Sequence, residues 1–502
     1  MNYAKNILKQ LINVFRVKKN RIFCILIILF VCAVNQTLNA QLPLMADINS
    51  LQKMQIDSAN IYIISTITIT GNAVTNKKVI MRELSFAPGD TISGRNLVLN
   101  VESSRNNLLK TNLFNYVTIV VEPSANDFVS IVINVEERWY LWPAFSIQTA
   151  NRNFSAWLQD MDFSRIEYGV GLKKYNFRGF NEKFSLNITR GINKIFSLHY
   201  SDIYFDKKRS HSISLYAAIF RQDQVQYNTH YNKPVYYKST DNYAYQDLKL
   251  SFSYRYRQNL QTSHMMSYRF VITTISDTVF NLNPQYFGNN SKKAFYNQLQ
   301  YEIRIDKRNS SYYPLTGNYG FIQINKYGLG FKQENINYAN ILVDSRWYFM
   351  LSNRFYAANQ LSFKKAFNHT QPFFIKKSLG YNTYRLNGYD FYVFDGEDYI
   401  FNKTILKFEL IPTRIIHLQF IPLPKFNKIH FASYINIFAN FGYVADYTNS
   451  YIENNNTYIN QWLSGYGAGI DFVTYYDKVL RIEYSINKAS ERGFFFHFYA
   501  PI

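Results

Sequence analysis

The chain has 502 residues and a net charge of +21, and 43 Tyr, 42 Phe and 5 Trp give it an aromatic content of 18%. With so few glycines and prolines, this composition excludes a disordered or collagen-like protein, because such chains lack buriable surface. Beyond residue 40 no apolar run reaches the length of about 18 residues needed by a membrane-spanning helix, which excludes a polytopic helical membrane protein.

The first 40 residues (1–40) are typical of a secretory signal peptide. Six basic residues and no acidic one come before a short apolar run at 22–34, and a polar stretch then leads to Ala40. This tripartite pattern predicts export with cleavage at Ala40. The alternative is an uncleaved N-terminal anchor, because Leu38 is large for the position three before the cut.

Both cysteines, Cys24 and Cys32, lie in that apolar run. Cleavage would leave a chain without cysteine, which excludes structural disulfides, a catalytic thiol and a thiolate metal site. It would also lower the net charge from +21 to +15 by removing the six basic residues. A basic exported chain suits anionic lipid headgroups, so we expect a membrane partner and no nucleic acid.

After a predicted linker at 41–59, residues 60–138 have a mixed pattern. A β-branched strand ends at Gly71, and two segments with apolar residues at helical spacing follow, the first with Thr75 as its predicted N-cap. Two more strands are predicted at 116–121 and 128–135. The expected order is β-α-α-β-β, an autonomous α+β domain.

The segment 139–502 shows strict alternation of apolar and polar residues, for example at 184–189, 248–257, 299–306 and 480–487. Such strands place their two faces in different environments, as in a soluble β-sandwich or a transmembrane β-barrel. The length of the segment, its aromatic residues near strand ends and the predicted export favour the barrel. Since lipid requires every backbone group to be paired, the strands must close, and about 16 would fit.

Several motifs together resemble a known family. The residues are TITGN at 68–72, LFN at 113–115, ERWYLWP at 137–143, YPLTG at 313–317, NGY at 387–389, GYGAG at 465–469 and FFFHF at 494–498. In this order they are similar to a periplasmic POTRA domain followed by the barrel of the BamA/TamA outer-membrane assembly family. The resemblance implies a mainly β fold: one POTRA domain and a 16-stranded antiparallel transmembrane β-barrel in the Gram-negative outer membrane.

The resemblance also implies a function. The family has a weakly closed seam between the first and last strands, where client barrel proteins add strands and pass into lipid, while the POTRA domain guides them. Here the seam would include five residues on the first and last strands: Ala144, Phe145, Phe494, Phe496 and Phe498. Implied partners are outer-membrane lipids and lipopolysaccharide, unfolded outer-membrane proteins, and periplasmic chaperones or accessory lipoproteins.

One departure from the family pattern concerns the sixth outer loop. In the family an arginine before a Gly-aromatic pair reaches an acid on the barrel wall, but here Asn387 precedes Gly388 and Tyr389. The wall position is Asn440, so both charges are missing together. We hypothesise a neutral Asn387–Asn440 contact, which avoids an unpaired buried charge.

An alternative is that another cationic residue of this loop takes the role of the family's arginine. Arg385 lies two residues before Asn387, on the same face of an extended segment, and Asp471 is an acid that it could reach.

No pattern indicates an enzyme. The eight histidines show no pair at helical ligand spacing, and no glycine-rich phosphate loop or nucleophile elbow occurs, so we expect neither cofactor nor metal. Trp139, Tyr140 and Trp142 at the domain junction are predicted membrane-interface anchors. Two other functions stay open: a secretion pore that threads clients through the lumen, and a passive barrel without assembly activity.

Overall fold

A computed structural model describes residues 56–124, 127–149, 161–240, 242–288, 290–368, 371–381, 384–417, 428–448, 450–474 and 478–498. The predicted signal peptide (1–40) and most of the predicted linker (41–59) lie outside these ranges. None of the helices in the described residues combines the length and apolarity needed to cross a bilayer.

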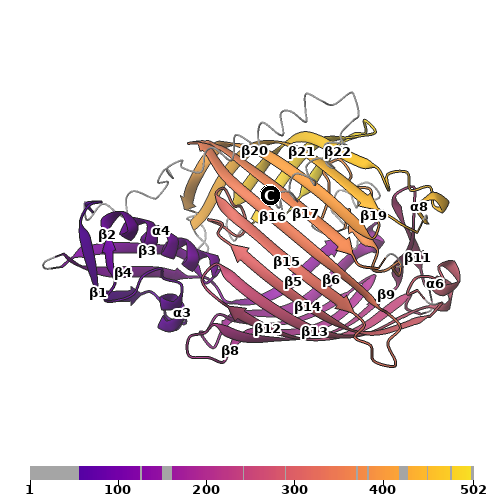
Figure 1. Cartoon of the computed structure of the whole chain (residues 1–502), viewed down its shortest axis with the longest axis horizontal. Helices are drawn as coiled ribbons and strands as arrows, with labels where there is room; N and C mark the ends of the chain where they lie inside the picture. The colour runs from indigo at the N-terminus through magenta and orange to yellow at the C-terminus, as the bar shows by residue number, and fades with distance from the viewer. Residues whose placement is uncertain are drawn as a thin grey trace, which may run out of the picture. The chain divides into compact units, whose positions relative to one another are not determined.

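The N-terminal domain is a four-stranded sheet with two helices (Figure 1). Its elements are β1 (Ile61–Thr70), α3 (Lys77–Arg82), β2 (Thr91–Ser93), α4 (Gly94–Lys110), β3 (Phe114–Pro123) and β4 (Phe128–Glu137). The strand order is β2-β1-β4-β3, with β1 parallel to β4. The expected elements are present. The short β2 was not predicted, because three residues show no resolvable alternation.

The start of α3 differs from the prediction. Asn76, not Thr75, is the N-cap, and its side chain accepts a hydrogen bond from the backbone N–H of Lys78 at 3.0 Å. The Thr75 hydroxyl instead donates to the Glu137 carboxylate at 2.6 Å. Because the Thr75 hydroxyl bonds to the buried Glu137 carboxylate, Thr75 does not cap the helix.

The core of this domain also corrects one expectation about the junction. Tyr140, predicted as a membrane-interface anchor, is 7% exposed and belongs to the hydrophobic core that contains Leu97, Leu108 and Ile131. Its hydroxyl donates to the backbone carbonyl of Leu113 at 2.9 Å. The apolar ring and satisfied hydroxyl make burial favourable, so Tyr140 stabilises the domain itself.

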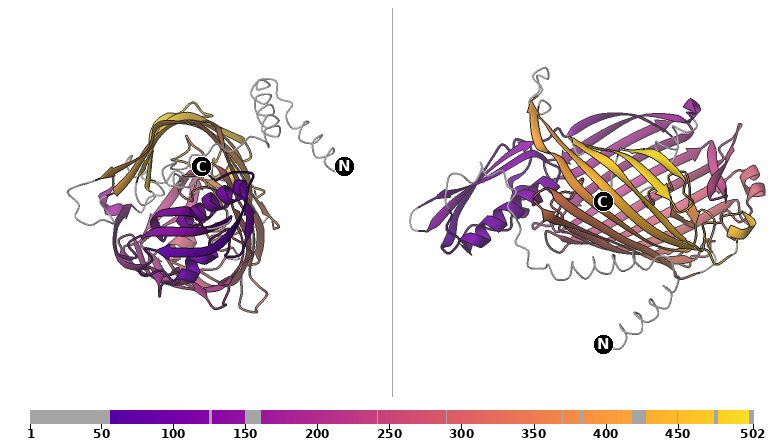
Figure 2. Two further views of the ribbon diagram at one scale, coloured as in Figure 1. Left: turned by 90° about the vertical axis from the view of Figure 1, so that its left-hand side faces the viewer. Right: turned by 90° about the horizontal axis from the view of Figure 1, so that it is seen from above.

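The C-terminal part is a 16-stranded antiparallel sheet that curls into a barrel (Figures 1 and 2). Its strands are β5 (Leu141–Thr149), β6 (Ile166–Phe177), β7 (Glu182–Arg190), β8 (Asn193–Tyr204), β9 (His211–Gln222), β12 (Tyr245–Arg257), β13 (Thr262–Ile275), β14 (Lys293–Asp306), β15 (Gly317–Tyr327), β16 (Tyr338–Ser352), β17 (Phe355–Ala366), β20 (Asp398–His417), β21 (Lys428–Ala445), β22 (Trp462–Thr474), β23 (Lys478–Asn487) and β24 (Arg492–His497). The predicted strand count is therefore confirmed.

Short elements gather at one end of the barrel (Figure 1). They are the hairpin β10 (Gln224–His230) and β11 (Lys233–Lys238), and the helices α6 (Asp277–Leu282) and α8 (Ser450–Glu453). A two-stranded sheet of β18 (Lys377–Leu379) and β19 (Phe394–Asp395), and a 3-10 turn at Phe163–Arg165, complete the described elements.

The two faces of the barrel wall have the predicted chemistry. Apolar side chains such as Leu250, Phe252 and Ile322 are exposed on the outside. Polar and charged side chains such as Asp344 and Arg481 are buried on the other face. This is the arrangement expected when the outside of the wall faces hydrocarbon.

The sheet has two ends. Its hydrogen-bonded order runs from β24 to β5, and no ladder joins these two strands in the described residues. The predicted seam residues Ala144 and Phe145 lie in β5, and Phe494 and Phe496 lie in β24. The last strand is short, with six residues against ten in β23.

A substitution of Glu137 tests the junction of the N-terminal domain. Its carboxylate accepts hydrogen bonds from the backbone N–H groups of Val74 and Thr75, at 3.1 and 2.6 Å, and from the Thr75 hydroxyl. Glu137→Ala leaves buried donors unsatisfied, which costs about 1–3 kcal/mol. We expect roughly 5–150-fold faster hydrogen exchange in the peptide around Thr75. Glu122→Gln, at an exposed position of β3, is the control; equal exchange in both variants would contradict the role of Glu137.

Candidate functional site

Loop 6 connects β17 to β20 and is partly buried. Its residues Leu386, Asn387, Tyr389 and Asp390 are between 1% and 6% exposed, although no helix or long strand includes them. A buried loop must have its polar groups satisfied, so its contacts with β21, β22 and β23 define how it is held.

Two glycines allow loop 6 to approach the wall. Gly388 has a φ of +84°, and a Cβ at this position would lie 3.2 Å from the backbone of Ile486. Across the contact, a Cβ on Gly465 of β22 would lie 2.1 Å from the carbonyl oxygen of Asn387. Asn487 Nδ2 donates to the Gly388 carbonyl at 3.1 Å, and the Tyr389 hydroxyl donates to the Ser464 carbonyl at the same distance.

Asn387 and Asn440 are in contact, but through a different bond from the one we expected. The backbone N–H of Asn387 donates to Oδ1 of Asn440 at 2.7 Å, and Nδ2 of Asn440 donates to the carbonyl of Gly465. The side chain of Asn387 points to another residue, since its Nδ2 donates to both carboxylate oxygens of Glu483, at 2.7 and 2.8 Å. An amide thus contacts a wall acid that the sequence did not single out.

The alternative pairing of Arg385 with Asp471 is wrong, because Asp471 has another partner. Asp471 is fully buried and accepts hydrogen bonds from Arg481 Nε and a second guanidinium nitrogen, at 2.6 and 2.8 Å, and from the Tyr313 hydroxyl at 2.6 Å. Arg481 and Asp471 face each other in the register of β22 and β23, which makes them closer partners than a loop residue. Arg385 instead acts electrostatically on Asp390.

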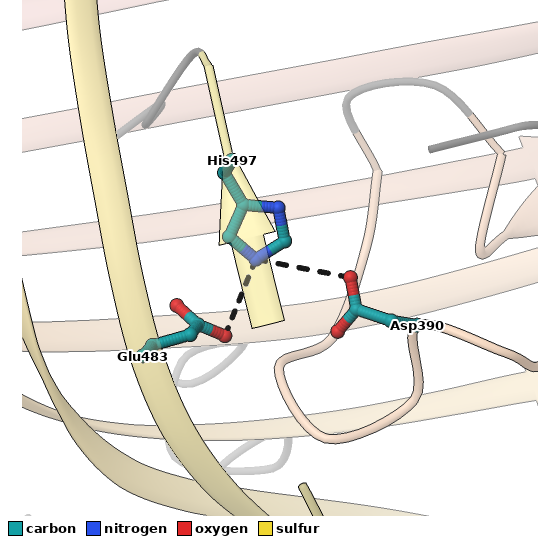
Figure 3. Close-up of side chains that lie close together, drawn as sticks. All are labelled: Asp390, Glu483 and His497. Atoms are coloured by element: carbon teal, nitrogen blue, oxygen red, sulfur yellow. Dashed lines mark ion pairs between the residues drawn. The ribbon is translucent and has the colours of Figure 1, made fainter. Parts of the chain in front are cut away.

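Loop 6 and the last two strands bring together Asp390, Glu483 and His497 (Figure 3). Nε2 of His497 lies 3.5 Å from a Glu483 oxygen and 3.8 Å from Oδ1 of Asp390. Burial raises the pKa of the Asp390 carboxyl; His497 is the largest opposing influence, and the Glu483 carboxylate raises the pKa further. Sequence reasoning did not join these three residues.

An ion cluster holds the outer part of loop 6. The Lys376 ammonium is 3.0 Å from Glu397 and 3.1 Å from Asp446, and all three residues are buried. Burial tends to raise the pKa of the Asp446 carboxyl, but Lys376 and hydrogen bonds from Thr448 and Ser450 outweigh it, so its pKa is lowered. For Glu397, burial dominates over Lys376 and its pKa is raised.

The predicted seam residues lie at the two ends of the sheet. Phe145 on β5 is 83% exposed, Phe494 on β24 is 69% exposed, and Phe498 directly after β24 is 63% exposed. Ala144 is in β5 and Phe496, half-buried, is in β24. Exposed aromatic rings at both edges suit a lipid-facing position.

Trp139 lies just before the first barrel strand and Trp142 lies within it. Trp139 is exposed and Trp142 is half-buried, and Nε1 of Trp142 donates to the carbonyl of Trp139 at 2.9 Å. Their role as interface anchors stays a prediction.

Together the barrel, its polar inner face and the inserted loop define an outer-membrane β-barrel with one POTRA domain. Comparison with protein families agrees. Residues 62–138 match the POTRA family, described as surface antigen variable number repeat, and residues 176–496 match the Omp85 superfamily domain. Since the second match covers more than half of the chain, the protein belongs to the Omp85 superfamily.

A solved structure has the same kind of fold at low sequence identity. CdiB from Escherichia coli is 10% identical with a TM-score of 0.51, over 88% of this chain and 74% of that chain. BamA from Haemophilus ducreyi lacking POTRA domains 1-3 is 16% identical with a TM-score of 0.48, over 87% and 84% of the two chains. No curated protein matches the sequence significantly.

Gly465→Ala tests how loop 6 is held. The added methyl group meets the Asn387 carbonyl and cannot be accommodated without moving the loop, at a cost of about 1–3 kcal/mol. We expect faster proteolysis of loop 6 while the barrel stays folded. Gly320→Ala on β15, where the nearest atom would be 3.4 Å away, is the matched control. Equal proteolysis of the two variants would show that loop 6 does not depend on this contact.

Proposed function

We propose that this protein inserts or exports outer-membrane proteins by strand addition at the edges of β5 and β24. The observation that carries the proposal is the open end of the sheet: in the described residues no ladder pairs these two strands. Membership of the Omp85 superfamily supports it, since its members act in outer-membrane protein assembly or secretion.

The physical basis is the chemistry of a sheet edge. A strand at the end of a sheet presents a row of N–H and C=O groups that another strand can pair with. In hydrocarbon an unpaired group costs several kcal/mol, so an incoming client strand gains more here than it would in water. No bond is made or broken covalently in this process.

The short last strand makes this edge easier to open. The ladder between β23 and β24 pairs residues 481–486 with residues 492–497, whereas the ladder between β21 and β22 extends over 13 pairs. Among the described residues, this is the shortest ladder between neighbouring strands of the barrel. A client strand can therefore compete with β24, or extend beyond it, at lower cost.

The POTRA sheet offers a second edge for clients. Strand β3 is at one end of the order β2-β1-β4-β3 and is ten residues long. Its length suits an extended peptide that adds as a fifth strand. In this proposal the POTRA domain lies in the periplasm and receives unfolded clients, from chaperones or accessory lipoproteins, while outer-membrane lipids and lipopolysaccharide surround the barrel.

Crosslinking the seam tests the strand-addition mechanism. Phe145→Cys with Phe494→Cys, joined by a bifunctional thiol reagent, should stop assembly because the edges can no longer separate. The control is Phe252→Cys with Tyr268→Cys, exposed register partners on β12 and β13 that are already joined by a ladder. The measurement is the level of outer-membrane proteins in depleted cells that carry each variant. Full activity of the seam-linked protein would favour a pore that threads clients through the lumen.

Depletion followed by quantitative outer-membrane proteomics tests the function itself. Loss of many barrel proteins would support a general insertase, and loss of one or two a dedicated factor. An unchanged proteome would contradict the proposal and leave a passive barrel.

A further inference from the structure

Asp390, Glu483 and His497 form a mixed carboxylate and imidazole cluster in the barrel lumen (Figure 3). Loop 6, β23 and β24 each supply one of them, and one potential ligand atom of each lies within 4.8 Å of the others. The cluster joins the inserted loop to the last strand of the sheet.

The distances around His497 are those of ligands that share an ion. Its Nε2 is 3.5 Å from Glu483 and 3.8 Å from Asp390, whereas N–H···O hydrogen bonds measure about 2.7–3.2 Å. In a tetrahedral zinc site with bonds of about 2.0–2.2 Å, neighbouring ligand atoms lie roughly 3.3–3.6 Å apart. The two N···O distances are close to this spacing, and all three ligand atoms lie within 4.8 Å of one another.

Charge and burial also favour a cation. Asp390 is 3% exposed and Glu483 is 1% exposed, and a single imidazole lies between their carboxylates. Buried carboxylates are costly unless paired. Arg385 and Lys403 act on Asp390 from a distance, and Arg481 and Lys403 act on Glu483. A divalent cation between the two acids would contact both of them directly.

Asn387 supplies an independent observation. It is 6% exposed, and its Nδ2 donates to the Glu483 carboxylate. Its Oδ1 accepts no hydrogen bond from the described residues, although the atom is buried. An amide that donates a hydrogen bond to a ligating carboxylate is a common second layer around a metal ion.

We propose that Asp390, Glu483 and His497 bind a Zn²⁺ ion. One imidazole and two carboxylates suit zinc and related transition metals, whereas Ca²⁺ and Mg²⁺ prefer six or more oxygen ligands. The bound ion fastens loop 6 to β24 and so stabilises the strand at the seam. This inference rests on the contacts alone and holds whether or not the protein assembles other barrels.

The test is a titration of the folded full chain with ZnCl₂. The protein carries no polyhistidine tag, is treated with a chelator, and is measured in detergent by calorimetry in excess Mg²⁺ and Ca²⁺. We expect one Zn²⁺ per chain. His497→Gln and Asp390→Asn should each remove the binding, and Asn387→Ala should weaken it by roughly 10–100-fold, as loss of a supporting residue does. His264→Gln, on β13 and hydrogen-bonded to Tyr301, is the matched control and should bind normally.

Hydrogen exchange provides a second readout that does not depend on assembly activity. Zn²⁺ should slow exchange in β24 and loop 6 of the unchanged chain and of His264→Gln, but not of His497→Gln. Heat-dependent gel mobility identifies the folded fraction, so that a misfolded variant is not counted as one that has lost the site. Equal zinc affinity in His497→Gln and His264→Gln, or no binding by the unchanged chain, would overturn the proposal.

Discussion

The need to pair every backbone N–H and C=O group in a medium without water is the constraint on which this structure depends. It forces the strands of the C-terminal segment into one continuous sheet, and it makes both ends of that sheet energetically unusual. In water, solvent molecules can pair with the N–H and C=O groups along a sheet edge. In hydrocarbon only another strand can do so, and the edge becomes a strong binding site for it. The proposed assembly activity is therefore a consequence of the same constraint that builds the barrel.

Much of the fold could be predicted from the sequence, because this constraint leaves a simple pattern. In a barrel wall between lipid and lumen, successive side chains of a strand must alternate between apolar and polar. In β12 the apolar Leu250 and Phe252 alternate with the polar Ser251 and Ser253. The POTRA helices were predictable from their apolar spacing. The N-cap was not, because the competition of Glu137 for Thr75 depends on a contact across 62 residues.

The site could be predicted only in part, because its contacts also join residues far apart in the sequence. Asn387 and Asn440 could be found because a family motif indicates both positions, and they do touch. Glu483 is one polar residue in an alternating strand and His497 is one polar residue in an aromatic run, so neither indicates the other, and Asp390 comes from a loop far away in the sequence. Tyr140 was misplaced because an aromatic residue beside two tryptophans looks the same in a membrane interface and in a core. Only the packing around Leu113 distinguishes the two.

The contacts of loop 6 with β21 and β22 are neutral, whereas its charged contacts are those of Lys376 and Asp390. Removing one member of a buried ion pair is strongly destabilising, so a loop that carried such a charge would leave its partner unpaired whenever it moved. In this chain the inner buried pair, Arg481 with Asp471, joins two neighbouring wall strands and survives any movement of the loop. To the wall the loop contributes neutral groups, chiefly the amide and backbone of Asn387.

Such contacts cost less to break than a buried ion pair. A neutral hydrogen bond contributes about 0.5–1.5 kcal/mol net, and one to a charged group, such as that from Asn387 to Glu483, about 1.5–3 kcal/mol. Besides the ion cluster of Lys376, loop 6 would then be held firmly where its own acid, Asp390, meets Glu483 and His497. That contact depends on compensating the two carboxylates, so occupancy by a cation would decide how strongly loop and last strand are joined. The family resemblance implies a fixed charged pair at this loop, which is replaced here by amides. The attachment of loop 6 would then depend on the ion that the proposed Asp390, Glu483 and His497 site binds.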